Sequence, residues 1–229
     1  MLPCPGFSLY ETLASSKGVS CNSIVILGKF YALSPEKQWE INIPHLISQI
    51  DQNTACILIN NPSNPCGSVY SKQHLLDLLA VAERFNLPII SDEIYADMVF
   101  DGHIFFPLAT LTNKVPILTC GGLAKRFLVP GWRVGWVLIH DRNDEFSQIR
   151  KGLLNLTTLT LGANSLIQAA IPDILENTPD SFHEETMSQL ESNAQISIKA
   201  LSGIPGITLV QPQGAMYLMV LVLGLSRLD

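Results

Sequence analysis

Five polar side chains of this sequence lie just after a short apolar segment or, for the last of them, at its start, and together could carry out chemistry on a carbonyl compound. They are an amide, a carboxylate, a phenol, an amine and a guanidinium: Asn64, Asp92, Tyr95, Lys125 and Arg133. Lys125 lies between the Gly-Leu-Ala sequence of residues 122–124 and the apolar residues 127–129, so we expect its amine to emerge into a partly apolar cleft. Desolvation there favours the neutral amine, which is the form that attacks a carbonyl carbon. An ordinary surface lysine beside Arg126 is the alternative interpretation.

Each of the other four side chains has a structural interpretation beside the functional one. Asp92 directly follows a buried strand, where a carboxylate must be solvated by a loop or paired with a cation. Tyr95 shares a face with Asp92 if the chain turns helical, and is otherwise a core aromatic residue. Asn64 lies in a turn with two prolines and a glycine, and its structural interpretation is that its amide only helps to form this turn. Arg133 could hold a phosphate bidentately or form a surface ion pair.

A single chemistry, that of pyridoxal phosphate, uses all five groups. Lys125 would form an imine with the aldehyde of the cofactor. Asp92 would keep the pyridine nitrogen protonated, so that the ring accepts electrons from a substrate carbanion. Tyr95 and Asn64 would hydrogen-bond the ring oxygen, and Arg133 would neutralise the phosphate. Once an amino acid displaces Lys125, the freed amine would move the α-proton as general base and then as general acid.

The sequence lacks the motifs of other common classes of site, such as metal sites, glycine-rich phosphate-binding loops and the serine nucleophile elbow. The five histidines show no ligand spacing, and no cysteines form a C-x-x-C pair. There is no G-x-G-x-x-G after a strand, no G-x-x-x-x-G-K loop and no G-x-S-x-G elbow. Glu93 beside Asp92 is not expected to form an acid–base pair, because adjacent strand residues point to opposite faces of a sheet.

The composition narrows the partners and the compartment. A net charge of -6 and a pI near 5.3 argue against a nucleic-acid partner. Five widely spaced cysteines indicate a reducing compartment without a structural metal. No secretory pattern opens the chain, so we expect a cytoplasmic protein. Residues 152–172 carry no charge, but their Asn, Thr, Ser and Gln side chains argue against a membrane span.

Four short apolar segments must position the candidate side chains. They cover residues 55–60, 87–92, 115–120 and 133–139. Each is too short for a buried helix and is continuously apolar, which predicts strands covered on both faces. Residues 71–85 have a helical stripe after the N-cap candidate Ser71, which predicts a βαβ unit. Because ligands bind beyond the carboxyl ends of parallel strands, the polar residues after these segments should meet at one rim.

The remaining pattern predicts an α/β protein with a mostly parallel sheet. Residues 143–177 and 180–203 have helical spacing, and residues 207–224 return to strand character. We therefore expect a large domain over residues 1–203 and the start of a smaller C-terminal subdomain over residues 204–229.

Four motifs, in order, resemble those of class I pyridoxal-phosphate-dependent aminotransferases. They read NNPSNPCGSVYSK, SDEIYADMVF, GGLAKRFLVPGWRVGW and QGAMYLMV. The third matches the lysine signature of the family at every defined position, including Lys125, Gly131 and Arg133. The resemblance extends from about Pro5 to Val220. Four motifs with the right order and spacing are far more specific than any one of them.

The resemblance implies the large domain of a fold-type-I pyridoxal-phosphate-dependent transferase, usually a homodimer, with helices flanking the sheet. It implies transfer of the amino group of an aromatic amino acid, tyrosine, to 2-oxoglutarate. In this carry-over Lys125 is the imine lysine and Asp92 the partner of the pyridine nitrogen. Tyr95 and Asn64 contact the ring oxygen, and Asn64 also touches the substrate carboxylate. Arg133 is a phosphate ligand.

The sequence departs from the family pattern at both ends and at one internal place. Family members carry a phosphate-binding loop that lies upstream of the position of Met1. They also carry a C-terminal arginine that holds the substrate carboxylate, and we do not assign this role to Arg227. The segment around residues 22–30 is longer than the corresponding segment of the family pattern. We therefore expect a truncated aminotransferase with impaired activity. The alternatives are a non-catalytic product that competes for the dimer interface of a full-length enzyme, and a pyridoxal-phosphate enzyme with another reaction, either a C–S lyase or a different aminotransferase.

Overall fold

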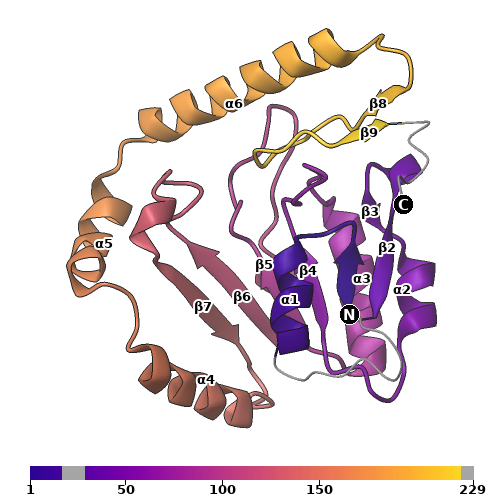
Figure 1. Ribbon diagram of the computed structural model, residues 1–229. Coiled ribbons are helices and arrows are strands. Elements are labelled where there is room, and N and C mark those ends of the chain that lie inside the picture. Colours follow the sequence, from indigo (N-terminus) through magenta and orange to yellow (C-terminus); the bar gives the residue numbers. More distant parts are fainter. Residues whose placement is uncertain (17–28, 223–229) are drawn as a thin grey trace.

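The computed structural model describes residues 1–16 and 29–222, and a four-stranded sheet organises them (Figure 1). Its strands lie in the order β4, β5, β6, β7. They span Ile57–Asn60, Ile89–Asp92, Ile117–Gly122 and Gly135–His140. The first three are parallel, whereas β7 pairs antiparallel with β6. The predicted α/β fold with a mixed, mostly parallel sheet is confirmed, and each strand begins two residues later than predicted.

A three-stranded sheet of earlier residues lies beside β4. β1 (Leu2–Cys4) pairs parallel with β2 (Phe30–Ser34), which pairs antiparallel with β3 (Glu40–Ile41). Where β1 passes β4, the amide of Leu58 donates to the carbonyl oxygen of Met1 at 3.0 Å. Sequence patterns did not predict these strands, because such short segments show no usable periodicity.

Helix α3 (Lys72–Phe85) connects β4 to β5 and confirms the predicted βαβ unit. Its N-cap is Ser71, whose hydroxyl accepts a hydrogen bond from the amide of His74. The helix ends where Asn86 adopts a left-handed conformation with φ of 51°. Its apolar stripe packs with the strands into the larger core, whose fully buried members include Ile57, Ile59, Leu75, Leu78, Ile89 and Ile117.

Strand β7 corrects one prediction, because it is not covered on both faces. Val137 is 43% exposed and Leu138 is 49% exposed, although these neighbours point to opposite sides of the sheet. The continuous apolar segment that forms β7 is therefore not a sign of burial on both faces within the described residues. The strand has exposed side chains on both faces, and no further strand pairs with its outer edge among the residues that the structure describes.

Three helices follow β7. They are α4 (Ser147–Thr160), α5 (Ser165–Asn177) and α6 (Asp180–Leu201). The stretch predicted over residues 143–177 is thus divided, because Leu161 and Gly162 adopt positive φ angles of 54° and 80°. Asn164 then caps α5 by accepting from the amide of Leu166. Figure 1 shows α4 and α5 on the β7 side of the molecule, whereas α6 runs along the top of the view toward the hairpin of residues 207–222.

Among the described residues of the first fifty, two helices were not predicted from the sequence. They are α1 (Ser8–Ser16) and α2 (Ile43–Gln49). Three short 3-10 helices connect other elements: η1 (Pro35–Lys37), η2 (Leu108–Thr110) and η3 (Pro130–Trp132). Of these elements, α1 matters most to the site, because it brings Tyr10 to the end of β5.

The last described elements are β8 (Ile207–Leu209) and β9 (Val220–Val222), which pair antiparallel as the strand character of the tail predicted. The division into residues 1–203 and 204–229 stays a prediction. Arg227 lies outside the described residues, as does the part of the longer segment over residues 22–28. None of the helices in the described ranges is both long enough and apolar enough to cross a membrane.

Candidate active site

The carboxyl ends of β4, β5 and β6 form one rim, where the last residues of β4 and β5 are in register with each other and with a residue two positions before the end of β6. Asn60 lies opposite Asp92, which in turn lies opposite Cys120. The side-chain amide of Asn60 donates to the backbone oxygen of Asp92 at 3.0 Å, and its Oδ1 accepts from the backbone amide of Asn64 at 2.7 Å. One buried asparagine therefore ties the loop that carries Asn64 to the strand that carries Asp92. The predicted convergence of these loops follows directly from the parallel strands.

Asp92 is held at this rim by two hydrogen bonds. The hydroxyl of Tyr10 donates to Oδ2 at 2.6 Å, and the amide of Ile94 donates to Oδ1 at 3.1 Å. Burial raises the pKa of the Asp92 carboxyl, while both hydrogen bonds and the positive charge of Lys125 act to lower it. The same contacts orient the carboxylate and partly compensate the cost of burying its charge.

Lys125 and Tyr95 meet beside this carboxylate. Lys125 is half-buried three residues beyond the end of β6, and its Nζ lies 5.4 Å from the centroid of the Tyr95 ring. Such a distance is within the range of a cation–π contact. The neighbouring Arg126 turns away to an exposed ion pair with Asp97, at 2.7 Å. The two cations of the Lys-Arg pair therefore have different surroundings, which favours a functional position for Lys125.

Tyr95 is buried and contacts a second phenol. Its hydroxyl oxygen lies 2.6 Å from that of Tyr217, and the two rings meet edge to face. Burial and the contact with Tyr217 hold the pKa of Tyr95 well above its ordinary value, and the Asn64 amide acts in the opposite direction. Tyr95 thus keeps its proton at neutral pH and can serve as a hydrogen-bond donor. The structure brings Asn64, Asp92, Tyr95 and Lys125 together.

Arg133 is the one predicted site residue that the structure does not bring into contact with the others. It does not open β7, as predicted, but follows η3 in a left-handed conformation with φ of 53°. Its guanidinium is exposed and donates to the carbonyl oxygen of Pro130 at 2.9 Å. Within the described residues it makes no hydrogen bond or ion pair with the other four candidates.

Three contributors to the rim were not predicted from the sequence. Asn60 and Tyr217 lie inside quoted motifs, so the motifs were a usable signal for them, but no role was assigned. No local sequence pattern could identify Tyr10, because its partner Asp92 is 82 residues away in the chain. Glu93, the other carboxylate of the second motif, accepts from the hydroxyl of Ser91 and the amide of Leu108, which agrees with its predicted separation from Asp92.

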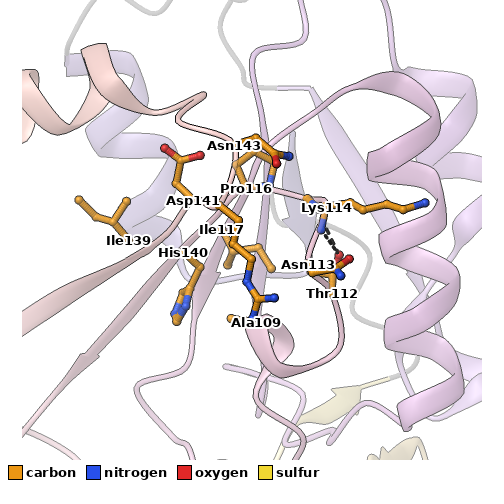
Figure 2. A pocket seen from close by; sticks show the side chains of 12 residues that line it. Ala109, Thr112, Asn113, Lys114, Pro116, Ile117, Ile139, His140, Asp141 and Asn143 are labelled. Atoms are coloured by element: carbon orange, nitrogen blue, oxygen red, sulfur yellow. Dashed lines mark hydrogen bonds between the residues drawn. The ribbon is translucent and has the colours of Figure 1, made fainter.

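A cavity of about 270 Å³ lies at the opposite end of the sheet (Figure 2). Its lining includes Pro116 and Ile117 at the start of β6 and His140 at the end of β7. The rim with Lys125 begins beyond the other end of β6, roughly 17 Å away for a strand of this length. This cavity is therefore separate from the candidate active site.

An open α/β sheet with an amine, a carboxylate, a phenol and an amide at one rim offers the groups that pyridoxal-phosphate chemistry uses. A family model for aminotransferase class I and II matches residues 4–226, and the chain belongs to that family. Pyridoxal phosphate is the cofactor of this family.

Two curated relatives and one solved structure are most informative. The chain is 56% identical to tyrosine aminotransferase of Mus musculus over 96% of its length and 47% of the relative. It is 55% identical to tyrosine aminotransferase of Homo sapiens, with the same coverage of both chains. The crystal structure of tyrosine aminotransferase from Leishmania infantum is 36% identical, with a TM-score of 0.87 over 93% of this chain and 51% of that one. The chain spans about half the length of the curated relatives it matches.

The rim fits the ring end of pyridoxal phosphate. Lys125 offers an amine for the aldehyde of the cofactor, and Asp92 offers a carboxylate for its protonated ring nitrogen. Tyr95 and Asn64 offer hydrogen-bond donors for its ring oxygen. The fit rests on the donor set and on the contacts that already orient Asp92 and Tyr95. The phosphate end has no comparable match in Arg133, whose guanidinium is directed to Pro130.

Proposed function

We propose that this chain carries the cofactor site of an aminotransferase that moves the amino group of an aromatic amino acid, tyrosine, to 2-oxoglutarate. The observation that carries the proposal is the meeting of Lys125, Asp92 and Tyr95 at one rim of the sheet. The tyrosine aminotransferases among its relatives support the choice of substrate.

Each residue has a distinct role in this proposal. When bound, pyridoxal phosphate supplies an electron sink for the carbanion formed at the substrate α-carbon. Lys125 holds the cofactor through Nζ and, once released, takes and returns the α-proton. Asp92 retains the proton of the ring nitrogen, and Tyr95 and Asn64 donate to the ring oxygen, with Asn64 also binding the substrate carboxylate. For Arg133 to bind phosphate, its guanidinium would have to leave the carbonyl oxygen of Pro130.

The Tyr10 hydroxyl supports the role of Asp92. Because it donates to Oδ2, it stabilises the ionised carboxylate without supplying a competing positive charge. The carboxylate keeps lone pairs for a second donor, which is what a protonated ring nitrogen requires.

The partners and the compartment follow from the same proposal. The substrates are an amino acid and a 2-oxo acid, and the assembly is a homodimer as in the full-length family. We place the protein in the cytoplasm, because its cysteines show no disulfide pattern: the four in the described residues are all free thiols.

Reconstitution of the 229-residue chain with pyridoxal phosphate tests the cofactor site. We expect an absorbance band near the visible range that Lys125→Ala abolishes, because Lys125 is the amine that the structure places beside Asp92 and Tyr95 to hold the aldehyde. Lys151→Ala, at an exposed position of α4, is the matched control and should retain the band. A band that persists in Lys125→Ala, or that never forms in the wild-type chain, contradicts the proposal.

A second candidate function is favoured by the open faces of β7. A chain that spans half of its relatives and exposes Val137 and Leu138 could occupy the interface of a full-length enzyme without catalysing a reaction. Co-purification with a full-length aminotransferase, together with loss of that enzyme's activity, would support this candidate. Measurable transamination by the chain alone would exclude it. Production of a keto acid without an amino acceptor would instead indicate a lyase.

A further inference from the structure

The segment after residue 204 reaches the rim through one hydroxyl group. The hydroxyl oxygens of Tyr217 and Tyr95 are 2.6 Å apart, and the ring centroids are 5.6 Å apart at an angle of 84°. Tyr95 is only 2% exposed, so its hydroxyl has little access to water and depends on protein partners. Tyr217 is half-buried and packs with Met98 and Ala215 around the Tyr95 ring.

Backbone contacts fix the position of this segment against the loops of the rim. The amides of Gln213 and Gly214 donate to the carbonyl oxygen of Gly67 at 2.8 and 3.0 Å, and the amide of Ala215 donates to Met98 at 2.8 Å. A Cβ atom on Gly214 would lie 2.5 Å from the Met98 oxygen, so only glycine permits this approach. Gly67 follows Asn64 and Met98 follows Tyr95, so the loops that carry the candidate donors also hold Tyr217.

The number of protons on the two phenols restricts how they can bond. A tyrosine hydroxyl donates one hydrogen bond and accepts others through its lone pairs. If Tyr95 donates to Tyr217, it has no proton left for a ring oxygen. If Tyr217 donates instead, the single proton of Tyr95 is free to point into the rim. Donation from Tyr217 also makes Tyr95 a stronger donor, because hydrogen bonds in a chain polarise one another.

We propose that Tyr217 is a positioning residue, which donates to the Tyr95 oxygen and so directs the Tyr95 proton toward the ring oxygen of the cofactor. Tyr217 acts through Tyr95 and does not itself need to touch cofactor or substrate. This inference rests on the proposed function, in which the rim binds pyridoxal phosphate. It assigns a purpose to the hydrogen bond that links residues after 204 to the loop after β5.

The test uses the 229-residue chain reconstituted with pyridoxal phosphate and the variants Tyr217→Phe, Tyr95→Phe and the double variant. The readouts are the cofactor dissociation constant and the pH midpoint of the absorbance change of the bound cofactor. We expect Tyr217→Phe to weaken binding about three- to tenfold, the effect of one hydrogen bond. The midpoint should rise by up to about one unit, because a weaker donor stabilises the ionised ring oxygen less. The double variant should match Tyr95→Phe alone.

Two controls separate positioning from a loss of structure. Tyr70→Phe removes a phenol hydroxyl from the larger core, away from the Tyr95–Tyr217 pair, and should leave both readouts at their wild-type values. Tyr217→His keeps a ring N–H donor and should bring the midpoint back toward wild type. This second variant also keeps the test open if Tyr217→Phe fails to fold.

Two results would overturn the inference. One is a Tyr217→Phe chain with the wild-type midpoint and affinity, and the other is a double variant whose effects equal the sum of the single ones. If the wild-type band depends on Lys125 while Tyr217→Phe changes nothing, only this inference fails. If the wild-type chain forms no such band, the proposed function fails and this inference falls with it.

Discussion

Asp92 and Glu93 are neighbouring carboxyl groups in entirely different surroundings. Asp92 ends β5 at the rim and accepts from Tyr10 and the amide of Ile94. Glu93 is buried, and its Oε1 accepts from the Ser91 hydroxyl at 2.9 Å and the Leu108 amide at 3.0 Å, which ties η2 to β5. One group is available to a ligand, whereas the other holds the loop over residues 94–108 in place.

Replacing Glu93 with Gln should change how stability depends on pH. Burial raises the pKa of Glu93 above the ordinary value of 4.5, although both hydrogen bonds oppose the shift. Its contribution to stability is therefore fully present below about pH 4.5 and is lost as pH rises through the folded-state pKa. Glu93→Gln keeps an oxygen acceptor but cannot ionise.

We expect urea unfolding to show that the free energy of unfolding of Glu93→Gln increases relative to that of the wild type between pH 4 and pH 7. Each unit by which the pKa is raised corresponds to about 1.4 kcal/mol. Glu176→Gln, at an exposed position of α5, is the control and should show no such trend. A stability difference that is the same at every pH would refute the role of burial.

The Tyr10 hydroxyl should contribute to cofactor affinity through Asp92. Tyr10→Phe removes the 2.6 Å hydrogen bond to Oδ2, so the pKa of Asp92 should rise further and its ionised form should be less available to a ring nitrogen. A hydrogen bond to a charged group contributes about 1.5–3 kcal/mol, so we expect cofactor binding at least roughly tenfold weaker. Fluorescence titration with pyridoxal phosphate measures this, and unchanged affinity would refute it.

At the scale of elements, close packing of β6 against β7 requires the two glycines that end β6. A Cβ atom on Gly121 would lie 2.6 Å from the Trp136 ring nitrogen, and one on Gly122 would lie 2.8 Å from the backbone oxygen of Val134. The first clash involves a side chain that can move, whereas the second involves backbone. Lys125 follows within three residues, so this pair of strands also sets where the candidate amine begins.

Gly122→Ala is therefore expected to destabilise the chain by about 1–3 kcal/mol, the usual cost of overpacking. Gly152→Ala in α4 is the matched control, since a Cβ atom there would meet nothing within 4 Å. It should be neutral or stabilising by up to about 1 kcal/mol, because alanine favours the helix. Chemical denaturation of both variants measures the difference. Equal effects would show that the β6–β7 contact does not constrain Gly122.

At the scale of the whole molecule, β7 is the outermost strand of its sheet within residues 1–16 and 29–222, and it has exposed side chains on both faces. An apolar edge strand with unpaired backbone groups promotes association between chains. We expect the 229-residue chain to self-associate in a concentration-dependent way, and Val137→Lys to reduce it. Ile104→Lys, at a residue 68% exposed in a loop, is the control and should have little effect. Sedimentation velocity over a concentration series measures both, and association unchanged by Val137→Lys would exclude β7 as its cause.

The sequence by itself determined some of the local elements and which types of side chain follow the strands at the rim. Helix α3, its cap at Ser71 and the four strands follow from periodicity and capping, which act over a few residues. The convergence of Asn64, Asp92 and Lys125 follows as well, because parallel strands bring their carboxyl ends to one edge.

Only the tertiary structure decided which groups surround these residues. Tyr10 is 82 residues from Asp92 and Tyr217 is 122 residues from Tyr95, so no local pattern connects either pair. The orientation of Arg133 toward Pro130 and the exposure of β7 also depend on how complete elements pack. Hydrophobic periodicity reports which face of an element is apolar. It carries no information about what, if anything, covers that face or which distant hydroxyl completes a hydrogen bond.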